Sequence, residues 1–439
     1  MREMKDSGIE WIGEIPQEWN IARLRDIKAE KKYAIVDGPF GSAISTNDYK
    51  ESGIPLIRIT NLKNGEVTEN DMVYISEELA EKVGRSSIGL SDIVFAKTGA
   101  TIGKCGVNKT IKYGILASSC VKISISHDFD HRFFYYIFLT DQFNEALKNT
   151  CTGTTRDTIN LSPFSKLNVV IPPYKSQHRI ADYLDRKCSQ IDAIIARQQE
   201  VIEKLKAYKL SVITEAVTKG LNPDVPMKDS GVEWIGEIPE HWVLNKLKYL
   251  SLDIGDGIHA TPTYDEDGNV YFVNGNNIGE EYLVFKEDTN TISDTEYASY
   301  KLPLLTENTV FVTLNGATYG KTSFYHGEKI LLGKSAGFIT LKPTESREFV
   351  RYYLQSYTAK LVMDLSLLGS TIANLSLRTL RDFVIPYPPR EEQIKIVLYL
   401  SKRISGIDAA VSKKEKIVRE LTDYKKSLIY EVVTGKKKV

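Results

Sequence analysis

The feature that most constrains this chain is a long stretch with apolar residues about every 3.5 positions, present twice. The first copy spans about residues 177–218 and the second about 393–434, which is 216 residues later. As a helix, each would be roughly 60 Å long at 1.5 Å per residue, and a compact domain cannot enclose such a length. An apolar seam on so long a helix has to be covered, and the other copy is its natural partner. The first helix leads from one globular region to the next, and the second leaves that next region. Two helices paired along their length must therefore be antiparallel.

The seam positions are apolar at matching places in the two copies. They are Ile180, Leu184, Ile191, Ile194, Val201, Leu205 and Tyr208 in the first copy, and Ile396, Leu400, Ile407, Ile417, Leu421, Tyr424 and Leu428 in the second. Polar residues interrupt both copies in step, Lys187 with Arg403 and Gln198 with Lys414, and polar seam residues commonly fix the register of a coiled coil. The alternative is that each helix packs only on its own globular neighbour.

A duplicated segment precedes each globular region. MKDSGIEWIGEIP at residues 4–16 returns as MKDSGVEWIGEIP at residues 227–239. Duplications of this kind dictate architecture. Because an identical sequence cannot distinguish two different ligands, we interpret the segment as a structural collar that packs its apolar side chains against a helix end, rather than as a binding site.

The regions between collar and helix share a skeleton but few residues. Short β-prone runs occur at 54–60, 93–96 and 121–125 in the first copy, and at 270–273, 310–312 and 338–341 in the second. A helical stretch follows in each, at about 129–147 and 348–368. We therefore expect an α+β chain in which two similar mixed α/β domains are separated by two long helices that form an antiparallel coiled coil. The expected segments are 1–173 with a collar at 4–27, the first long helix at 174–220, 221–388 with a collar at 227–250, and the second long helix with a basic tail at 389–439.

Composition excludes several classes of protein. Lys plus Arg and Asp plus Glu number 57 each, so a nucleic-acid binder would have to gather its basic groups in patches. The cysteines, Cys105, Cys120, Cys151 and Cys188, have neither CxxC spacing nor a disulfide-dense pattern, which indicates reduced thiols and no zinc site. No apolar run suits a signal peptide or a membrane span. We expect a cytoplasmic protein that binds neither metal nor membrane.

Glycine loops in both copies evoke a phosphate-binding loop. They are GATIGK at residues 99–104 and GATYGKT at residues 316–322. A P-loop needs four residues between its glycines, so that successive backbone amides surround the phosphates, and here there are three. We expect a structural glycine turn that presents Lys104 and Lys321 to a DNA phosphate.

Two further motifs suggest methyltransferase chemistry and fall short of it. LDIGDG at residues 252–257 resembles a methyl-donor loop, but His259 stands where a further glycine is usual. IPPY at residues 171–174 has Ile171 in place of the Asn, Asp or Ser that grips the target nitrogen. Nothing else assembles into a catalytic set, so we expect a chain that is not an enzyme.

Collar, variable domain and long helix, each present twice, resemble the specificity subunit of a type I restriction–modification enzyme. The resemblance covers essentially the whole chain, and its most specific parts are the WIGEIP-x-x-W collars, the GAT-x-GK loops and the pairs Ile191-Asp192 and Ile407-Asp408. It implies two target recognition domains that each read half of a split sequence in double-stranded DNA. It also implies a coiled coil that sets the gap and docks two modification subunits. Those subunits would carry S-adenosylmethionine and methylate adenine, restriction or translocase subunits could join them, and this chain would bind no cofactor.

Candidate DNA contacts follow from comparing the two copies. Identity between copies marks scaffold and divergence marks readout, so base contacts are expected where the copies differ, at 40–49 against 259–264 and at 58–64 against 274–277. Because Asn suits adenine and Arg suits guanine, the base-reading candidates are Arg58, Asn61, Asn274, Asn276 and Asn277, with Arg156 as a further one. Asn is equally a turn residue. The candidates at or beside shared loops, where phosphate contacts position the protein without specifying sequence, are Lys97, Lys104, Thr154, Tyr319, Lys321 and Ser370.

Two other functions stay open at this point. A scaffold that binds proteins but not DNA would show no salt-dependent DNA affinity. A methyltransferase fragment would bind methyl donor on its own.

Overall fold

The computed structural model describes residues 3–40, 42–151, 157–316, 318–367 and 374–439. The chain forms two compact units, residues 1–198 with 416–439 and residues 199–415. Each unit combines a globular α/β region with one half of each of two long helices, α6 (Tyr174–Lys219) and α12 (Arg390–Val433). The segments expected from the sequence divide the chain into consecutive stretches, whereas each of the two observed units contains part of both long helices.

The first unit is built around a six-stranded sheet in the order β4-β13-β10-β11-β7-β6. Strand β10 is wholly buried and pairs antiparallel with both β13 and β11. A four-stranded sheet, β8-β5-β12-β9, contains a parallel pair, β5 with β12. The strands are β1 Met4–Asp6, β2 Glu14–Pro16, β3 Asn20–Arg23, β4 Ile35–Asp37, β5 Ile54–Ile57, β6 Leu62–Lys63, β7 Glu66–Val67, β8 Val73–Ile75, β9 Ser87–Ile88, β10 Ile93–Ala96, β11 Cys105–Val107, β12 Gly114–Leu116, β13 Cys120–Ile123 and β14 Asn168–Ile171. The helices before α6 are α1 Leu24–Ile27, α2 Glu77–Lys82, α3 His131–Phe138, α4 Asp141–Lys148 and α5 Leu161–Ser165, with 3-10 turns η1 Thr46–Asp48, η2 Ile59–Asn61, η3 Gly84–Ser86 and η4 Gly99–Thr101.

The second unit repeats this plan with fewer strands. Its main sheet has the order β18-β24-β21-β22, and a three-stranded sheet, β20-β19-β23, contains the parallel pair β19 with β23. The strands are β15 Met227–Asp229, β16 Glu237–Pro239, β17 Val243–Lys246, β18 Ser251–Asp256, β19 Val270–Val273, β20 Thr291–Ile292, β21 Thr309–Thr313, β22 Thr322–Phe324, β23 Ile330–Leu332, β24 Ala336–Leu341 and β25 Val384–Tyr387. The helices before α12 are α7 Leu247–Leu250, α8 Asp294–Ala298, α9 Arg347–Leu354, α10 Tyr357–Ser366 and α11 Leu377–Arg381, with the 3-10 turn η5 Gly275–Asn277. The six β-prone runs of the sequence are β5, β10, β13, β19, β21 and β24, displaced by at most three residues at their ends.

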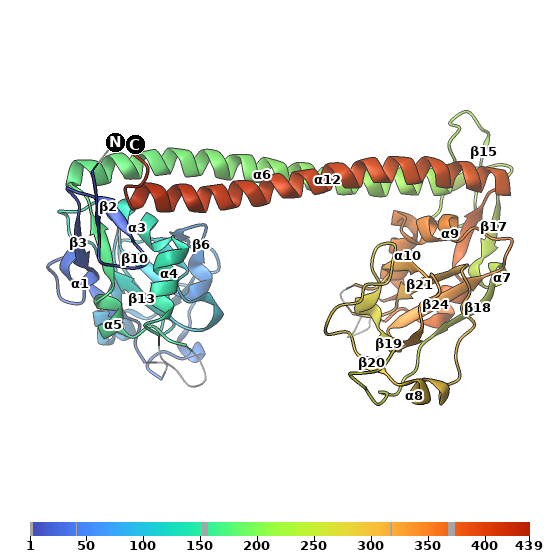
Figure 1. The fold of residues 1–439 in the computed structure, drawn as a ribbon, viewed down its shortest axis with the longest axis horizontal. Coiled ribbons are helices and arrows are strands. Elements are labelled where there is room, and N and C mark those ends of the chain that lie inside the picture. Colours follow the sequence, from blue (N-terminus) through green and yellow to red (C-terminus); the bar gives the residue numbers. More distant parts are fainter. Residues whose placement is uncertain (1–2, 41, 152–156, 317, 368–373) are drawn as a thin grey trace. The chain divides into compact units, whose positions relative to one another are not determined.

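Each helical stretch expected after the strands is in fact two helices. In the first unit the break falls at Thr140, whose hydroxyl accepts a hydrogen bond from the Phe143 amide (3.3 Å) as the N-cap of α4. In the second unit Ser356 does the same for α10, accepting from the Ala359 amide (3.2 Å). Capping by Ser or Thr starts a new helix even where the apolar pattern continues. In both units these paired helices lie between the main sheet and the long helices (Figure 1).

Each long helix ends at a glycine that packs against a collar. Gly220 follows α6 and Gly435 follows α12, with φ of 78° and 76°, the left-handed conformation that glycine adopts most easily. A Cβ on Gly220 would lie 3.2 Å from the Trp242 ring, and one on Gly435 would lie 2.5 Å from Pro16 and 3.0 Å from the Trp19 ring. Both tryptophans are buried in the cores that enclose these helix ends. The collars therefore pack against helix ends, as the sequence predicted.

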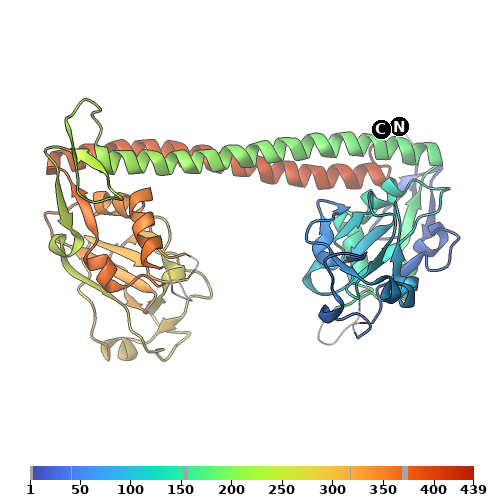
Figure 2. The same cartoon turned by 180° about the vertical axis from the view of Figure 1, so that it is seen from behind.

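Within each unit α6 and α12 lie side by side and run in opposite directions (Figures 1 and 2). Leu184 shares a core with Leu428 in the first unit, and Val212 shares one with Leu400 in the second. Lys209 pairs with Asp408 (2.7 Å) in the second unit and Lys425 pairs with Asp192 (2.7 Å) in the first. These two ion pairs are copies of one another, because Asp408 and Lys425 stand 216 residues after Asp192 and Lys209. The predicted antiparallel pair is confirmed, and the ion pairs explain why aspartate follows Ile191 and Ile407.

The strict 3.5-residue seam is wrong in part. Ile194, Tyr208 and Tyr424 are exposed, and Val201, Leu205, Ile417 and Leu421 are only half-buried. Their neighbours Cys188, Ile202, Ile404 and Ile429 are buried instead. An α-helix has 3.6 residues per turn, so a 3.5 repeat drifts by about 20° per heptad and leaves the buried face over a long helix. Lys187 and Arg403 are exposed, and Arg403 donates a hydrogen bond to the Tyr208 hydroxyl of the other long helix (2.6 Å).

None of the helices in the described part of the chain has an apolar stretch of the length that a membrane span requires.

Candidate nucleic-acid interface

The GAT-x-GK loops are tight turns between buried strands. Their glycines, Gly99 and Gly103 in one unit and Gly316 and Gly320 in the other, all have φ between 73° and 87°. The turns close with equivalent backbone bonds: the Ala96 amide donates to the Lys104 carbonyl (2.8 Å), and the Thr313 amide donates to the Lys321 carbonyl (2.9 Å). The loops are therefore structural glycine turns. Each leaves its lysine exposed where the next strand begins.

A second turn, η2 in one unit and η5 in the other, is also built identically in both. The Asn61 side chain accepts from the Arg58 amide (2.9 Å), and the Asn277 side chain accepts from the Asn274 amide (2.9 Å). Asn61 also donates to the Asn70 carbonyl (3.0 Å) and is fully buried. Asn61 is therefore a turn residue and is not placed to read a base, because both ends of its amide are in use inside the protein. The same holds for Asn277, whose amide nitrogen donates to the Val284 carbonyl (3.1 Å).

In the second unit the remaining asparagines line a polar hollow of about 330 Å³. Asn276 is exposed there, and Asn274 is half-buried with its amide oxygen 3.3 Å from the Ser335 hydroxyl. Lys321 and Thr318 of the glycine loop line the same hollow. The structure thus brings together two candidate groups, 274–277 and the loop at 316–322, that lie about 40 residues apart in the sequence.

Sequence reasoning missed the third wall of this hollow, which is the loop that carries Lys286 and Asn290. Both side chains are exposed and both are of types that read bases or bind phosphate. The only signal in the sequence was a polar run, KEDTN, between two apolar segments, and such a run is more often a solvated turn.

The corresponding candidates of the first unit are partly engaged in the protein. Lys97 forms an ion pair with Asp37 (2.6 Å), which also binds Arg85 (3.1 Å). Arg58 donates to the Asp71 carbonyl (2.5 Å) and lies over the Tyr49 ring. Lys97 is therefore held as a structural partner of Asp37, whereas Lys104 keeps an exposed ammonium group.

One aromatic side chain of the first unit is unusually exposed. Phe40, in the divergent segment 40–49, is 83% exposed. Two residues before it the chain lies close against another segment, since a Cβ on Gly38 would lie 1.9 Å from the Ala117 carbonyl oxygen.

Three predicted contacts, Thr154, Arg156 and Ser370, lie outside the described residues. A fourth, Tyr319, is half-buried, and its hydroxyl donates to the Asp364 carboxylate of α10. That hydrogen bond raises the pKa of Tyr319. The side chain is thereby held toward α10, inside the second unit.

The motifs that suggested methyl transfer have other roles. Residues 252–257 largely form strand β18, and residues 171–174 are the connection from β14 to α6.

Burial raises the pKa of both Cys105 and Cys120 to about 12, so these thiols are neutral and unreactive. Over the residues that the structure describes, no cluster of His, Cys, Asp and Glu is arranged to hold a metal ion.

The sequence matches the family model described as "Type I restriction modification DNA specificity domain" at residues 16–204 and 255–419. The chain belongs to this family. Specificity subunits are non-catalytic parts of type I restriction–modification complexes. The two matched segments each include one globular region and a large part of one long helix.

Several proteins described as specificity subunits match nearly the whole chain. The putative MjaX specificity subunit of Methanocaldococcus jannaschii is 24% identical, with 98% of this chain and 96% of that protein covered. The EcoKI specificity subunit of Escherichia coli K12 is 20% identical, with 96% and 90% covered. A chain from a structural study of complex assembly in a type I system superimposes with a TM-score of 0.70 at 16% identity, covering 95% of this chain and 98% of that one. The HsdS subunit of Thermoanaerobacter tengcongensis gives a TM-score of 0.50 at 16% identity, covering 96% and 98%.

Proposed function

We propose that this chain reads a split, asymmetric site in double-stranded DNA, with one half-site for each globular region. The observation that carries the proposal is the pair of η2 and η5 turns. Their hydrogen bonds are the same in both units, yet Arg58 stands at the position that Asn274 occupies in the other. A common scaffold that holds different side chains is what two related readers of different sequences require.

The lysines of the glycine loops would supply the contacts that are independent of sequence. Lys104 and Lys321 occupy equivalent, exposed positions at the ends of equivalent turns. An ammonium group there binds a phosphate as a point charge and fixes register without reading a base. In the second unit Lys321 would anchor the backbone beside the hollow that Asn274 and Asn276 line.

The long helices would space the half-sites and dock two modification subunits, which would bring S-adenosylmethionine and methylate adenine. In the second unit Ile394, Leu398 and Tyr399 are exposed on α12, and Leu398 is 66% exposed. Ile394 and Leu398 stand one helical turn apart, on one face. Exposed apolar clusters of this kind mark protein-binding surfaces.

The test is an exchange of recognition regions. Replacing residues 28–170 with those of a differently specific relative should alter one half of the methylated site and leave the other half unchanged, as mapped by genome-wide adenine methylation. The matched control replaces the stretch of α6 at residues 186–206, which should leave both half-sites unchanged. A change in both halves after the first exchange, or in neither, would contradict the proposal.

A second test addresses the helices. Insertion of one turn into both α6 and α12 should widen the unread gap and preserve both half-sites. An unchanged gap with full activity would show that the helices do not set the spacing.

A further inference from the structure

The second unit contains a cavity of about 730 Å³ where α9 and α10 meet the long helices. It is separate from the asparagine-lined hollow, although Lys321 lines both. Pockets of roughly 300–1,000 Å³ are the size that holds a small organic ligand. Nothing in the DNA-reading role requires a cavity at this place.

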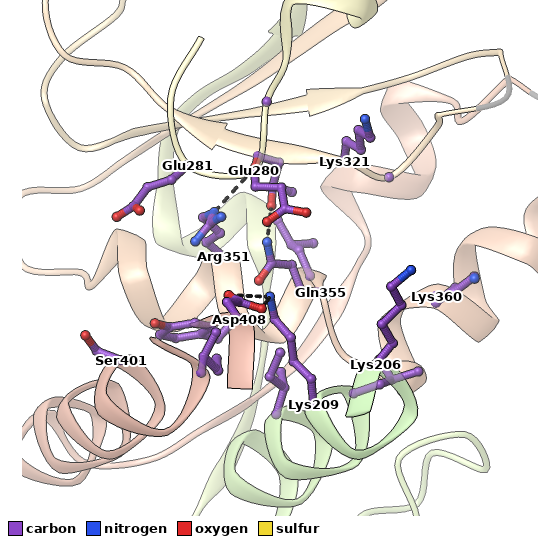
Figure 3. A pocket seen from close by; sticks show the side chains of 18 of the residues that line it. Lys206, Lys209, Glu280, Glu281, Lys321, Arg351, Gln355, Lys360, Ser401 and Asp408 are labelled. Carbon is purple, nitrogen blue, oxygen red and sulfur yellow. Dashed lines mark hydrogen bonds and ion pairs between the residues drawn. The ribbon is translucent and has the colours of Figure 1, made fainter. Parts of the chain in front are cut away.

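Five cationic side chains line this cavity, and they come from several elements. They are Lys206 and Lys209 of α6, Lys321 of the glycine loop, Arg351 of α9 and Lys360 of α10. Three acidic residues also line it, Glu280, Glu281 and Asp408. Asp408 is neutralised by Lys209 (2.7 Å), and Lys206 pairs with Glu203 outside the cavity (3.3 Å). In Figure 3, Lys206 and Lys360 project at one edge and Arg351 projects further inside.

Arg351 is the least expected of these residues, because it is a charged group only 8% exposed. Its Nε donates a long hydrogen bond to the Thr322 carbonyl (3.4 Å), and its guanidinium lies 4.9 Å from the centre of the Phe324 ring. Among the described residues, no carboxylate lies within 4 Å of it to form an ion pair. Burial lowers the pKa of Arg351, and the charges of Tyr352, Glu281 and Glu280 offset this only in part. A buried cation without an ion-pair partner is costly.

The first unit shows how the same fold seals this place. The residue that corresponds to Arg351 is Tyr135, whose hydroxyl packs so closely on Gly65 that a Cβ there would lie 1.9 Å away. The residue that corresponds to Lys360 is Asn144, which donates to the Phe138 and Thr140 carbonyls (both 3.0 Å). Cationic side chains therefore stand in the second unit where the first has neutral ones.

We propose that this cavity binds a small phosphorylated organic molecule. The flat guanidinium of Arg351 can hold two oxygens of one phosphate group, and Lys360 and Lys321 can neutralise further charge. Leu210, Ile213, Leu354 and Ile404 supply an apolar wall for the organic part. A free ligand fits this site better than the backbone of a duplex, because a phosphate within a rigid double helix cannot reach so deeply buried a side chain.

The experiment is calorimetric titration of the full chain, without DNA, with inorganic phosphate, pyrophosphate, AMP and ATP. We expect at least one of AMP and ATP to bind at one site per chain with a dissociation constant below 1 mM at physiological salt, and more tightly than inorganic phosphate. Arg351→Tyr installs the residue that the first unit uses and should weaken this binding at least tenfold, because it removes a charge-assisted pair of hydrogen bonds. Lys360→Asn, at an exposed position that cannot disturb the core, should weaken binding several-fold.

The matched control is Lys204→Ala, which removes a lysine of the same helix that pairs with Glu200 on the exposed face. It should bind the nucleotide as the unchanged chain does, and circular dichroism should show that every variant is folded. Three results would overturn the proposal. The first is that no probe binds with a dissociation constant below 1 mM, and the second is that the Lys360→Asn and Lys204→Ala variants bind the nucleotide equally well. The third is that Arg351→Tyr, tested without nucleotide, loses as much affinity for DNA as it loses for the nucleotide.

Discussion

The buried face of α6 can be tested by comparing two substitutions that a 3.5-residue seam treats as equivalent. Leu184 and Ile194 are both seam positions in the sequence, yet Leu184 is 0% exposed and Ile194 is 46% exposed. The perturbation is Leu184→Ala against Ile194→Ala in the full chain. Both remove a large aliphatic side chain from within the same long helix, so that the environment is what differs.

The expected costs follow from burial. Leu184 lies in the core that joins α6, α12 and the first globular region, so truncation should lower the free energy of unfolding by about 2–5 kcal/mol. Ile194 is half in solvent, and alanine is the better helix former, so its truncation should cost less than about 1 kcal/mol. For a unit of about 220 residues, the first cost corresponds to a fall in the melting midpoint of roughly 4–20 °C.

The assay is urea and thermal unfolding followed by circular dichroism and by tryptophan fluorescence, since Trp19 lies in the same core as Leu184. The matched variant in the second unit is Leu400→Ala. Leu400 is the counterpart of Leu184 and is also 0% exposed, so that its truncation should have the same effect. If Ile194→Ala costs as much as Leu184→Ala, the seam follows the 3.5 repeat and our account of the drift is wrong.

Three further predictions concern single side chains. Lys321→Ala should reduce the slope of log affinity against log salt for DNA by about 0.9 without altering base preference, as measured by titration at several salt concentrations; an altered preference would make Lys321 a base reader. Asn61→Ala should cost about 1–3 kcal/mol of stability in urea, because it removes a fully buried side chain and both of its hydrogen bonds, from the Arg58 amide and to the Asn70 carbonyl; a cost near zero would mean that the turn does not depend on it. Burial raises the pKa of Asp130, but the interactions with Arg132, chiefly hydrogen bonds, together lower it by a larger amount, so that the net shift of the pKa is downward. The stability that this carboxylate contributes is therefore present above the ordinary pKa of about 4 and is lost as pH falls through the lower folded value. Asp130→Ser, which keeps the N-cap, should be less stable than the unchanged chain at pH 7, and the difference in unfolding free energy should shrink as the pH falls below the ordinary pKa of an aspartate; a constant difference at every pH would exclude the charge as its cause.

The sequence by itself determined the features that depend on local pattern or on repetition. The duplicated collars and helices required a twofold plan, and the length of the seam required two helices that cover one another. The glycines of the GAT-x-GK loops implied tight turns, because three intervening residues cannot cradle a phosphate. The β-prone runs were found to within three residues. Strands of two or three residues, such as β7 and β22, were missed because they are too short to show a period.

Tertiary structure alone decided which side chains remain free to act. Asn276 and Asn277 are adjacent and of the same type, but the side chain of Asn277 is held by the Asn274 amide and the Val284 carbonyl whereas Asn276 is exposed. Lys97 is held by Asp37 from 60 residues away, a pairing that sequence distance conceals. The cavity around Arg351 has the same origin, because its lining residues come together only when α9 and α10 pack on the long helices. A period or a turn is encoded by neighbouring residues, whereas availability for binding depends on partners that only the folded chain brings within reach.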